Sequence, residues 1–352
     1  MSATNAPEMR APLIDVHAHF VTDDYVTAAR AAGHEHPDGM PGWPSWSGAE
    51  HLRLMDEWGV GKSIQSISSP GTHFGDDDAA RALTRQVNDV GAEVARAHPD
   101  RFGHFASLSL PDVDGALAQL THALDEVGSD GVTVETNSGG VYLGDARYEP
   151  LYDELNRRRA VVFVHPTSPL CAEQISLGRP RPMLEFLFDS TRTVSDLVLT
   201  GTLTRYPNIE WVCTHGGGTL PLLAERMELF RTMLFGGNHH EPSVQQQVTR
   251  LWFDMAGTPF PRQVPALIDA FGADRLLYGS GYCWTPAAGV SQQMAAIDTA
   301  VPPDNDTWRA RTTRNAARLL PLTTAIQRGS PPGRRPSPSS TKTPPPPDVR
   351  WR

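Results

Sequence analysis

Two histidines near the N-terminus, His17 and His19, have a spacing that lets both of them bind one metal ion. They stand at the end of a short apolar run that begins at Leu13. On a strand, residues two positions apart point to the same face, so both imidazoles face one side while Val16 and Ala18 face the other. Imidazole nitrogens are common ligands of zinc. The pair therefore predicts half of a metal site.

Other apolar runs predict the elements that position this pair and two further histidines. His165 ends the fifth run and His215 ends the sixth. Eight such runs, most of them separated by helical spacing, are typical of a (β/α)8 TIM barrel, in which the active site lies at the carboxyl ends of the strands. We therefore predict that the four histidines share one site. The predicted strands are Leu13–His17, Lys62–Ser68, Phe102–Leu108, Val132–Thr136, Ala160–His165, Ile209–His215, Leu251–Met255 and Arg275–Ser280. The clearest helical stretches are Ala79–Val94, behind an acidic cap at Asp76 to Asp78, Val113–Leu124, Leu222–Leu234 and Val264–Phe271.

Two segments on the same rim suit substrate binding. The connection after the first predicted strand, residues 33–47, is long and rich in Gly, Pro and aromatic residues, which is typical of a functional lid. Its Trp43 and Trp46 either cover a flat substrate or pin the loop to the surface. After the second predicted strand, the turn that contains Ser69 directs hydroxyl groups toward the rim.

Composition and charge exclude several classes of function. The 352 residues are 39% apolar and 20% charged, which suits one large domain. No run of about 18 or more apolar residues is present, and the first residues lack a secretory pattern, so we expect a cytoplasmic protein without a membrane role. A net charge of −9 argues against binding of nucleic acid. Three scattered cysteines predict no disulfide framework. The predicted domains are an N-terminal extension at 1–11, the barrel at 12–328 and a disordered Pro-rich tail at 329–352.

Four motifs in order resemble a known family. DVHAHF, FVHP, THGGGTLP and LLYGS before an aromatic pair resemble the amidohydrolase-related metal enzymes of the aminocarboxymuconate-semialdehyde decarboxylase type. The resemblance runs from about Leu13 to Leu320. Three further segments are similar to the corresponding segments of family members that decarboxylate salicylate-type acids such as 6-methylsalicylate. They are the SISSPGT turn, the PSWS loop and FLFDSTRTV. The resemblance implies a metal-dependent, hydrolase-like barrel that catalyses the non-oxidative decarboxylation of a hydroxylated aromatic acid. It also implies a homodimer.

The resemblance also implies roles for individual residues. His17, His19 and His165 match the metal ligands of the family, and His215 matches an acid/base or water-orienting group. Three imidazoles favour zinc, with manganese as the alternative if substrate oxygens complete its coordination. Arg192 is either a fork for the substrate carboxylate or one half of a surface ion pair. The predicted substrate-binding residues are Arg192, Trp46 and Ser69, and the aromatic residues that either stack on the ring or belong to the core are Trp43, Trp46, Phe188 and Trp284.

One catalytic position departs from the family pattern. The family has an aspartate at the end of strand eight that binds metal and transfers a proton, but this chain has Gly281 in the sequence GSGYCW. Glycine has no side chain and can take neither role. Three accounts are open: the chain is an impaired variant, a water fills the gap and His215 takes over protonation, or Asp15, Glu135 or Cys283 is drawn in.

Three functions follow from these residues. The leading prediction is a metal-dependent decarboxylase of a small, salicylate-like aromatic carboxylate, active or impaired. The second is a hydrolase of a lactone, ester or amide on the same scaffold, which uses metal-bound hydroxide. The third is a non-catalytic barrel whose site has decayed.

Overall fold

The computed structural model describes residues 12–235, 242–302, 304 and 306–320. These residues belong to one compact unit. The predicted N-terminal extension at 1–11 and the predicted disordered tail at 329–352 lie outside the described residues. Within the described part of the chain, no helix has both the length and the apolar character that are needed to cross a membrane.

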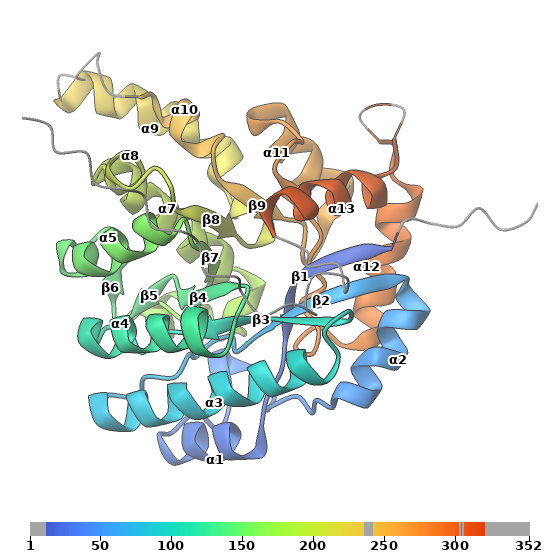
Figure 1. Cartoon of the computed structure of the whole chain (residues 1–352). Helices are drawn as coiled ribbons and strands as arrows, with labels where there is room; N and C mark the ends of the chain where they lie inside the picture. The colour runs from blue at the N-terminus through green and yellow to red at the C-terminus, as the bar shows by residue number, and fades with distance from the viewer. Residues whose placement is uncertain (1–11, 236–241, 303, 305, 321–352) are drawn as a thin grey trace, which may run out of the picture. The chain divides into compact units, whose positions relative to one another are not determined.

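Eight parallel strands form the centre of this unit (Figure 1). They pair in the order β1-β2-β3-β4-β7-β8-β9-β10. The first and last strands meet through a bridge between Asp15 and Tyr278 and through a 3.0 Å hydrogen bond from the backbone N–H of Val16 to the Tyr278 carbonyl. The sheet is thus nearly closed into a barrel, which confirms the predicted fold and its eight strands. The strands are β1 (Leu13–His19), β2 (Val60–Ser66), β3 (Phe102–Ser107), β4 (Gly131–Glu135), β7 (Val161–His165), β8 (Glu210–Cys213), β9 (Trp252–Asp254) and β10 (Leu276–Leu277).

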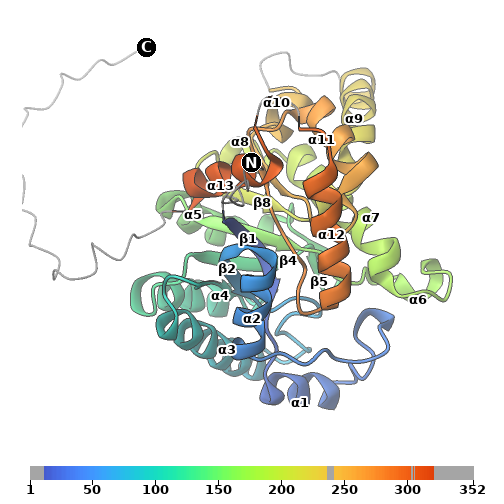
Figure 2. The same cartoon turned by 90° about the vertical axis from the view of Figure 1, so that its right-hand side faces the viewer.

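Helices follow most of the strands and lie outside them (Figure 2). The predicted helical stretches are confirmed as α3, α4, α9 and α11. Asp76 caps α3, because its side chain accepts a 2.8 Å hydrogen bond from the backbone N–H of Ala79. The helices are α1 (Asp23–Ala31), α2 (Gly48–Trp58), α3 (Asp77–Ala97), α4 (Val113–Thr121), α5 (Glu149–Arg158), α6 (Ala172–Ile175), α7 (Glu185–Leu199), α8 (Thr202–Arg205), α9 (Leu220–Phe235), α10 (Val244–Val248), α11 (Val264–Phe271), α12 (Ala287–Thr299) and α13 (Trp308–Leu319).

Several short elements were not predicted from the sequence, because each is too short to show a helical or strand period. They include an antiparallel hairpin after β4 and single turns of 3-10 or π helix in the loops. These elements are β5 (Asn137–Ser138), β6 (Val141–Tyr142), η1 (Pro37–Gly39), η2 (His122–Glu126), η3 (Ala146–Tyr148), η4 (Arg181–Met183), η5 (His215–Gly217) and η6 (Pro259–Gln263).

The alternation of β7 shows how the core directs a histidine to the rim. Val161 and Phe163 belong to one buried apolar cluster, whereas Val162 and Val164 belong to another cluster that includes side chains of α5. Both faces of the strand are therefore buried, as expected for a parallel strand covered by helices. His165 lies two residues after Phe163 and so points to the same side, at the carboxyl end of the strand.

Candidate metal and active site

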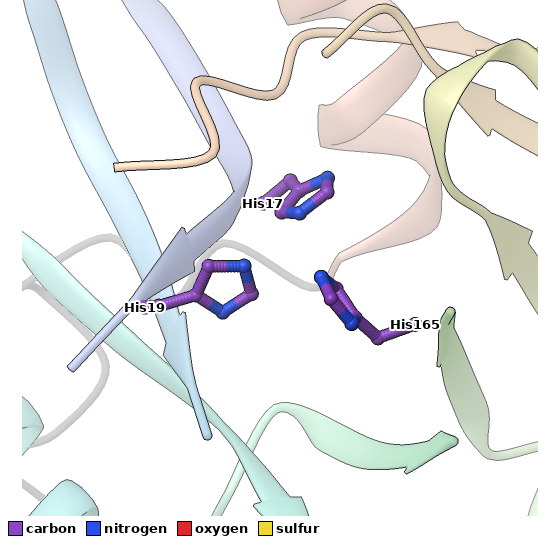
Figure 3. Close-up of side chains that lie close together, drawn as sticks. All are labelled: His17, His19 and His165. Carbon is purple, nitrogen blue, oxygen red and sulfur yellow. The ribbon is translucent and has the colours of Figure 1, made fainter. Parts of the chain in front are cut away.

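Three histidines from two strand ends meet at the rim of the barrel (Figure 3). His17 and His19 come from β1, and His165 is the last residue of β7. All three are buried, and one ligand atom from each lies within 4.8 Å of the others. The ring centroids are between 4.9 and 5.3 Å apart, in edge-to-face arrangements. The structure therefore brings together the three residues that the sequence predicts as ligands.

Hydrogen bonds at Nδ1 fix the orientation of His19 and His165. Nδ1 of His19 lies 3.2 Å from the hydroxyl of Ser66 and 3.3 Å from its carbonyl oxygen. Nδ1 of His165 lies 2.7 Å from the carbonyl oxygen of Pro166. A carbonyl oxygen can only accept, so the Nδ1 of each ring carries the proton and the lone pair of Nε2 is left for a metal ion.

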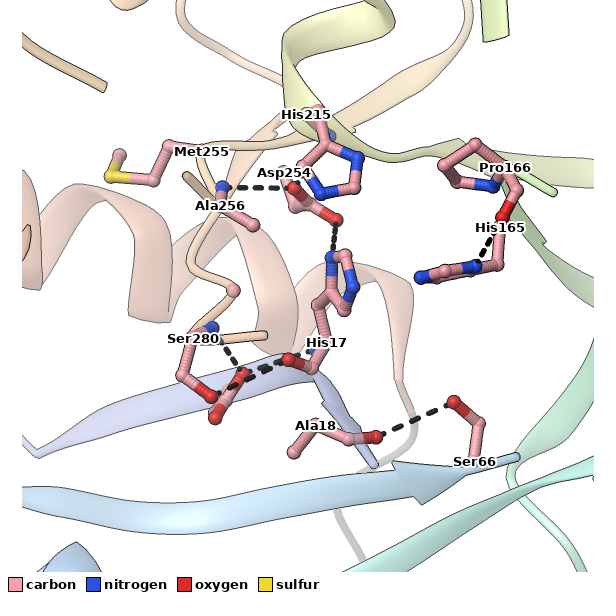
Figure 4. Close-up of polar contacts among 12 residues, drawn as sticks. His17, Ala18, Ser66, His165, Pro166, His215, Asp254, Met255, Ala256 and Ser280 are labelled. Atoms are coloured by element: carbon pink, nitrogen blue, oxygen red, sulfur yellow. Dashed lines mark hydrogen bonds and ion pairs between the residues drawn. The ribbon is translucent and has the colours of Figure 1, made fainter. Parts of the chain in front are cut away.

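Asp254, the last residue of β9, holds the third ring and was not singled out from the sequence. Its Oδ2 lies 2.8 Å from Nδ1 of His17, and its Oδ1 accepts 2.9 Å hydrogen bonds from the backbone N–H groups of His215 and Ala256 (Figure 4). Burial acts to raise the pKa of Asp254, but the charge and hydrogen bond of His17 and the charge of His215 outweigh it and leave the pKa below its ordinary value. An ionised Asp254 thus orients His17. The available signal was its place at the carboxyl end of the seventh predicted strand.

The donor set fits a divalent metal ion. Burial, followed by the charges of neighbouring histidines, holds the pKa of both His19 and His165 well below the usual range. Neutral imidazole is the form that binds metal, so no proton has to leave at neutral pH. Three imidazole nitrogen donors suit zinc, and manganese fits if further oxygen ligands are added.

A cavity of about 120 Å³ lies at the three histidines. Three more of the predicted site residues, His215, Ser69 and Gly281, line it. Two aromatic side chains, Phe186 and Trp284, also line it. Trp284 was among the predicted stacking candidates, whereas Phe186 was missed. The cavity thus combines a cluster of nitrogen ligands with apolar faces of the kind that hold an aromatic ring.

Other predicted substrate-binding residues do not line this cavity. A guanidinium nitrogen of Arg192 donates a 2.8 Å hydrogen bond to the buried carboxylate of Asp189. The indole N–H of Trp46 donates a 3.1 Å hydrogen bond to Nδ1 of His51. Phe188, one of the stacking candidates, has 47% of its surface exposed. The structure does not bring these side chains to the histidine cluster, because each polar group has found a partner elsewhere and Phe188 faces outward.

His215 offers an unsatisfied polar atom beside the cluster. It begins η5, separated from the end of β8 at Cys213 by Thr214 alone, and its ring centroid lies 5.1 Å from that of His17. Its Nδ1 is buried and has no hydrogen-bond partner among the described residues. Burial and the charge of His17 lower its pKa to about 4. A bound ligand or an ordered water can satisfy such an atom.

Gly281 lies after β10, the eighth strand of the barrel, where the chain approaches the three histidines. Its backbone N–H donates a 2.8 Å hydrogen bond to the carbonyl of His17, and its φ of +70° is a left-handed conformation that favours glycine. A Cβ at this position would lie only 2.6 Å from the hydroxyl of Thr285. Asp15 does not compensate, because it accepts hydrogen bonds from the backbone N–H groups of His17 and Ser280 and does not line the cavity.

The long predicted loop, residues 33–47, lies between α1 and α2 and contributes Asp38 and Met40 to the cavity. Trp43 pins this loop: its indole N–H donates a 2.8 Å hydrogen bond to a carbonyl of the same loop, and its ring packs 5.5 Å from that of Trp284. The pinning role predicted for the tryptophans as one alternative is therefore the one seen at Trp43. Sequence reading missed Asp38 and Met40, because a loop has no period that shows which side chains face inward.

The structure is a (β/α)8 barrel with a buried cluster of three histidines at the carboxyl ends of its strands, and comparisons with known proteins give the family. The amidohydrolase family model matches residues 14–322. The chain therefore belongs to the amidohydrolase family. It is 32% identical to decarboxylase macB of Penicillium terrestre over 304 residues, which cover 81% of this chain and 88% of that protein. It is 33% identical to 6-methylsalicylic acid decarboxylase of Penicillium expansum over 280 residues, which cover 76% and 84%.

Solved structures agree with the barrel. A crystal structure described as an amidohydrolase II superposes with a TM-score of 0.82 and 34% identity, covering 89% of this chain and all of the other. The manganese complex of 5-carboxyvanillate decarboxylase from Novosphingobium aromaticivorans superposes with a TM-score of 0.79 at 18% identity, covering 89% of this chain and 97% of the other. At that identity the second likeness supports the fold alone.

Proposed function

We propose that this chain is a metal-dependent, non-oxidative decarboxylase of a hydroxylated aromatic acid of the salicylate type. The observation that carries the proposal is the set of three buried imidazoles beside a small cavity with aromatic walls. The 33% identity to a 6-methylsalicylic acid decarboxylase over 76% of this chain supports the same reaction. We further propose that the loss of a carboxylate at Gly281 does not abolish this activity.

His17, His19 and His165 are the residues that would hold the ion, zinc first and manganese as the alternative. A solved decarboxylase of this fold contains manganese. When bound, a divalent ion supplies Lewis-acid chemistry: it polarises the oxygen atoms of a chelating hydroxy acid and neutralises their charge. Asp254 keeps His17 in the orientation and tautomer that such a site needs.

The remaining cavity residues position the substrate and exclude water. Phe186 and Trp284 offer apolar faces to the ring. Ser69, whose hydroxyl lies 2.7 Å from that of Thr167, can orient a substrate oxygen. His215 brings the unpartnered Nδ1 described above, and we propose that it hydrogen-bonds a substrate oxygen or orients a water. Together these side chains hold a ring carboxylate beside the nitrogen cluster.

The test is decarboxylation by the metal-loaded chain. The purified protein is stripped of metal, reloaded with Zn²⁺ or Mn²⁺, and given 6-methylsalicylate, salicylate and 2,6-dihydroxybenzoate. We expect release of CO2 and of the matching phenol from at least one acid, with little activity in the stripped protein. Hydrolysis of a lactone or ester panel without CO2 release would instead support the hydrolase, and no turnover of any panel would support a non-catalytic barrel.

The association state and the compartment are also proposals. The resemblance implies a homodimer, and α9 exposes five large apolar side chains of the kind that interfaces cover. These are Leu222, Leu229, Phe230, Met233 and Leu234. Sedimentation velocity of the full chain measures the association state, and fractionation of the producing cells tests the cytoplasmic assignment.

A further inference from the structure

The proposed reaction needs an acid beside the ring, and Gly281 cannot supply it. Protonation of the ring carbon that bears the carboxylate has to come from a group that reaches the cavity. Among the described residues that line the cavity at the three histidines, Asp38 is the only carboxylic acid. Asp38 lies far from Gly281 in the sequence, in the loop between α1 and α2.

The backbone and a neighbouring serine hold Asp38 in place. Its φ of +54° and ψ of +24° are left-handed, a conformation that aspartate and asparagine tolerate better than most residues and that is frequent at functional sites. Its Oδ1 accepts a 2.5 Å hydrogen bond from the hydroxyl of Ser168, three residues after His165. The acid is thus tied to the same loop that follows the third metal ligand.

The surroundings of Asp38 favour a protonated carboxyl. Burial raises its pKa, and hydrogen bonds with Ser168 and Ser69 and the charge of His34 oppose that rise without cancelling it. On the other side, the carboxyl of Glu135 is also buried and has its own pKa raised well above the usual range by burial and by the charge of Asp38. A carboxyl with a raised pKa keeps its proton to a higher pH than an ordinary aspartate does, which suits it to act as an acid.

A second cavity gives this acid a source of protons. Asp38 also lines a larger cavity of about 840 Å³, which is bordered by Glu135 and by the turn after β2. That volume is ample for water. Glu135 itself lines only the larger cavity and not the one at the three histidines, so Asp38 is the carboxyl that touches both.

We propose that Asp38 is the catalytic acid of this chain and takes over the role left empty at Gly281. This inference rests on the proposed decarboxylase function. In the step, the O–H bond of Asp38 breaks and a C–H bond forms at the ring carbon that bears the carboxylate. The bond from that carbon to the carboxylate then breaks, its electron pair restores the aromatic ring, and CO2 leaves. The carboxylate of Asp38 regains a proton from water in the larger cavity.

The decisive comparison is Asp38→Asn against Glu35→Gln. Asparagine is nearly isosteric, tolerates the left-handed backbone and can still accept from Ser168, so the fold should survive. Glu35 is an acid in the same loop with 65% of its side chain exposed. Each metal-loaded variant is measured for kcat on 6-methylsalicylate, for metal content, for Kd of salicylate and for thermal unfolding. In D2O, NMR follows exchange of the 3-methylphenol hydrogen that lies between the hydroxyl and the methyl group.

We expect Asp38→Asn to lower kcat roughly 10²- to 10⁴-fold and to lose the ring exchange, with metal content and salicylate affinity kept. Glu35→Gln should match the unaltered chain. The proposal would be overturned if Asp38→Asn kept both kcat and ring exchange. It would also be overturned if His215→Asn lost both while Asp38→Asn kept them, because His215 would then be the acid. A parallel loss of salicylate affinity would make Asp38 a binding group instead. If the unaltered chain neither releases CO2 nor exchanges the ring hydrogen, the proposed function itself fails, and this inference fails with it.

Discussion

The strand ends and the long loop between α1 and α2 both line the cavity, but they hold their polar groups in different ways. His165 ends a strand that pairs on both sides and has both faces buried. Asp38 sits in a loop, where one left-handed residue and a hydrogen bond from Ser168 set its place. The difference suggests that the two regions have different roles. Strands supply the side chains that must converge on one metal position, and a loop supplies the side chain that must exchange its proton with water.

Among the groups held by strands, loss of His165 should have the largest effect. We expect His165→Ala to lose bound metal and to lower activity by more than the roughly 10- to 100-fold that the loss of an outer partner of a ligand costs. Metal analysis of the purified protein, together with the decarboxylation assay, measures both. The exposed His98→Ala is the matched control and should keep full metal. Full zinc content in His165→Ala would remove His165 from the ligand set.

Asp254 tests whether a predicted metal ligand on a strand needs its hydrogen-bond partner. Because an amide cannot replace the ionised acceptor at Nδ1 of His17, we expect Asp254→Asn to weaken metal affinity roughly 10- to 100-fold. Competition with a chelator gives the metal Kd. Asp274→Asn, in which an acid with 88% exposure is changed, should leave that Kd unaltered. Equal affinities in the two variants would mean that His17 needs no partner to bind metal.

Ser168 tests the loop side through pH. Activity needs the protonated acid and falls as pH rises through the pKa of Asp38. The hydrogen bond from Ser168 lowers that pKa, so Ser168→Ala should raise it and move the alkaline limb of the kcat profile to higher pH. Ser45→Ala, which changes an exposed serine in the loop of Asp38, is the control. A limb that stays in place, or that moves to lower pH, would contradict the assignment of the limb to Asp38.

Gly281 gives the smallest expected effect. A left-handed backbone and a Cβ that meets the Thr285 hydroxyl should make Gly281→Asp less stable by about 1 to 3 kcal/mol, without added metal binding. Urea unfolding and metal analysis measure the two quantities, and adding Thr285→Ala should recover part of the stability. Raised metal content at unchanged stability would show instead that a carboxylate at this position reaches the ion.

The sequence predicted the groups that follow a period and missed those that do not. The apolar runs give all eight strands, and the alternation within a strand gives the facing of the His17 and His19 pair. Asp254 is the only acid in the short predicted strand Leu251–Met255, and nothing in that strand's sequence shows that its side chain faces His17. Phe186 and Phe188 are equal candidates until the phase of α7 is known. Asp38 depends on the path of a loop, which distant contacts with the loop after β7 determine.

Asp254 also has an evolutionary consequence. One of its oxygens holds a metal-binding ring, while the other holds the backbone of His215 and of Ala256. Any replacement therefore disturbs two parts of the centre in a single mutational step, so selection should tolerate few alternatives there. If the acid has moved to Asp38, position 281 is released from that selection. We expect lineages close to this chain to vary at position 281 while they keep both Asp254 and Asp38.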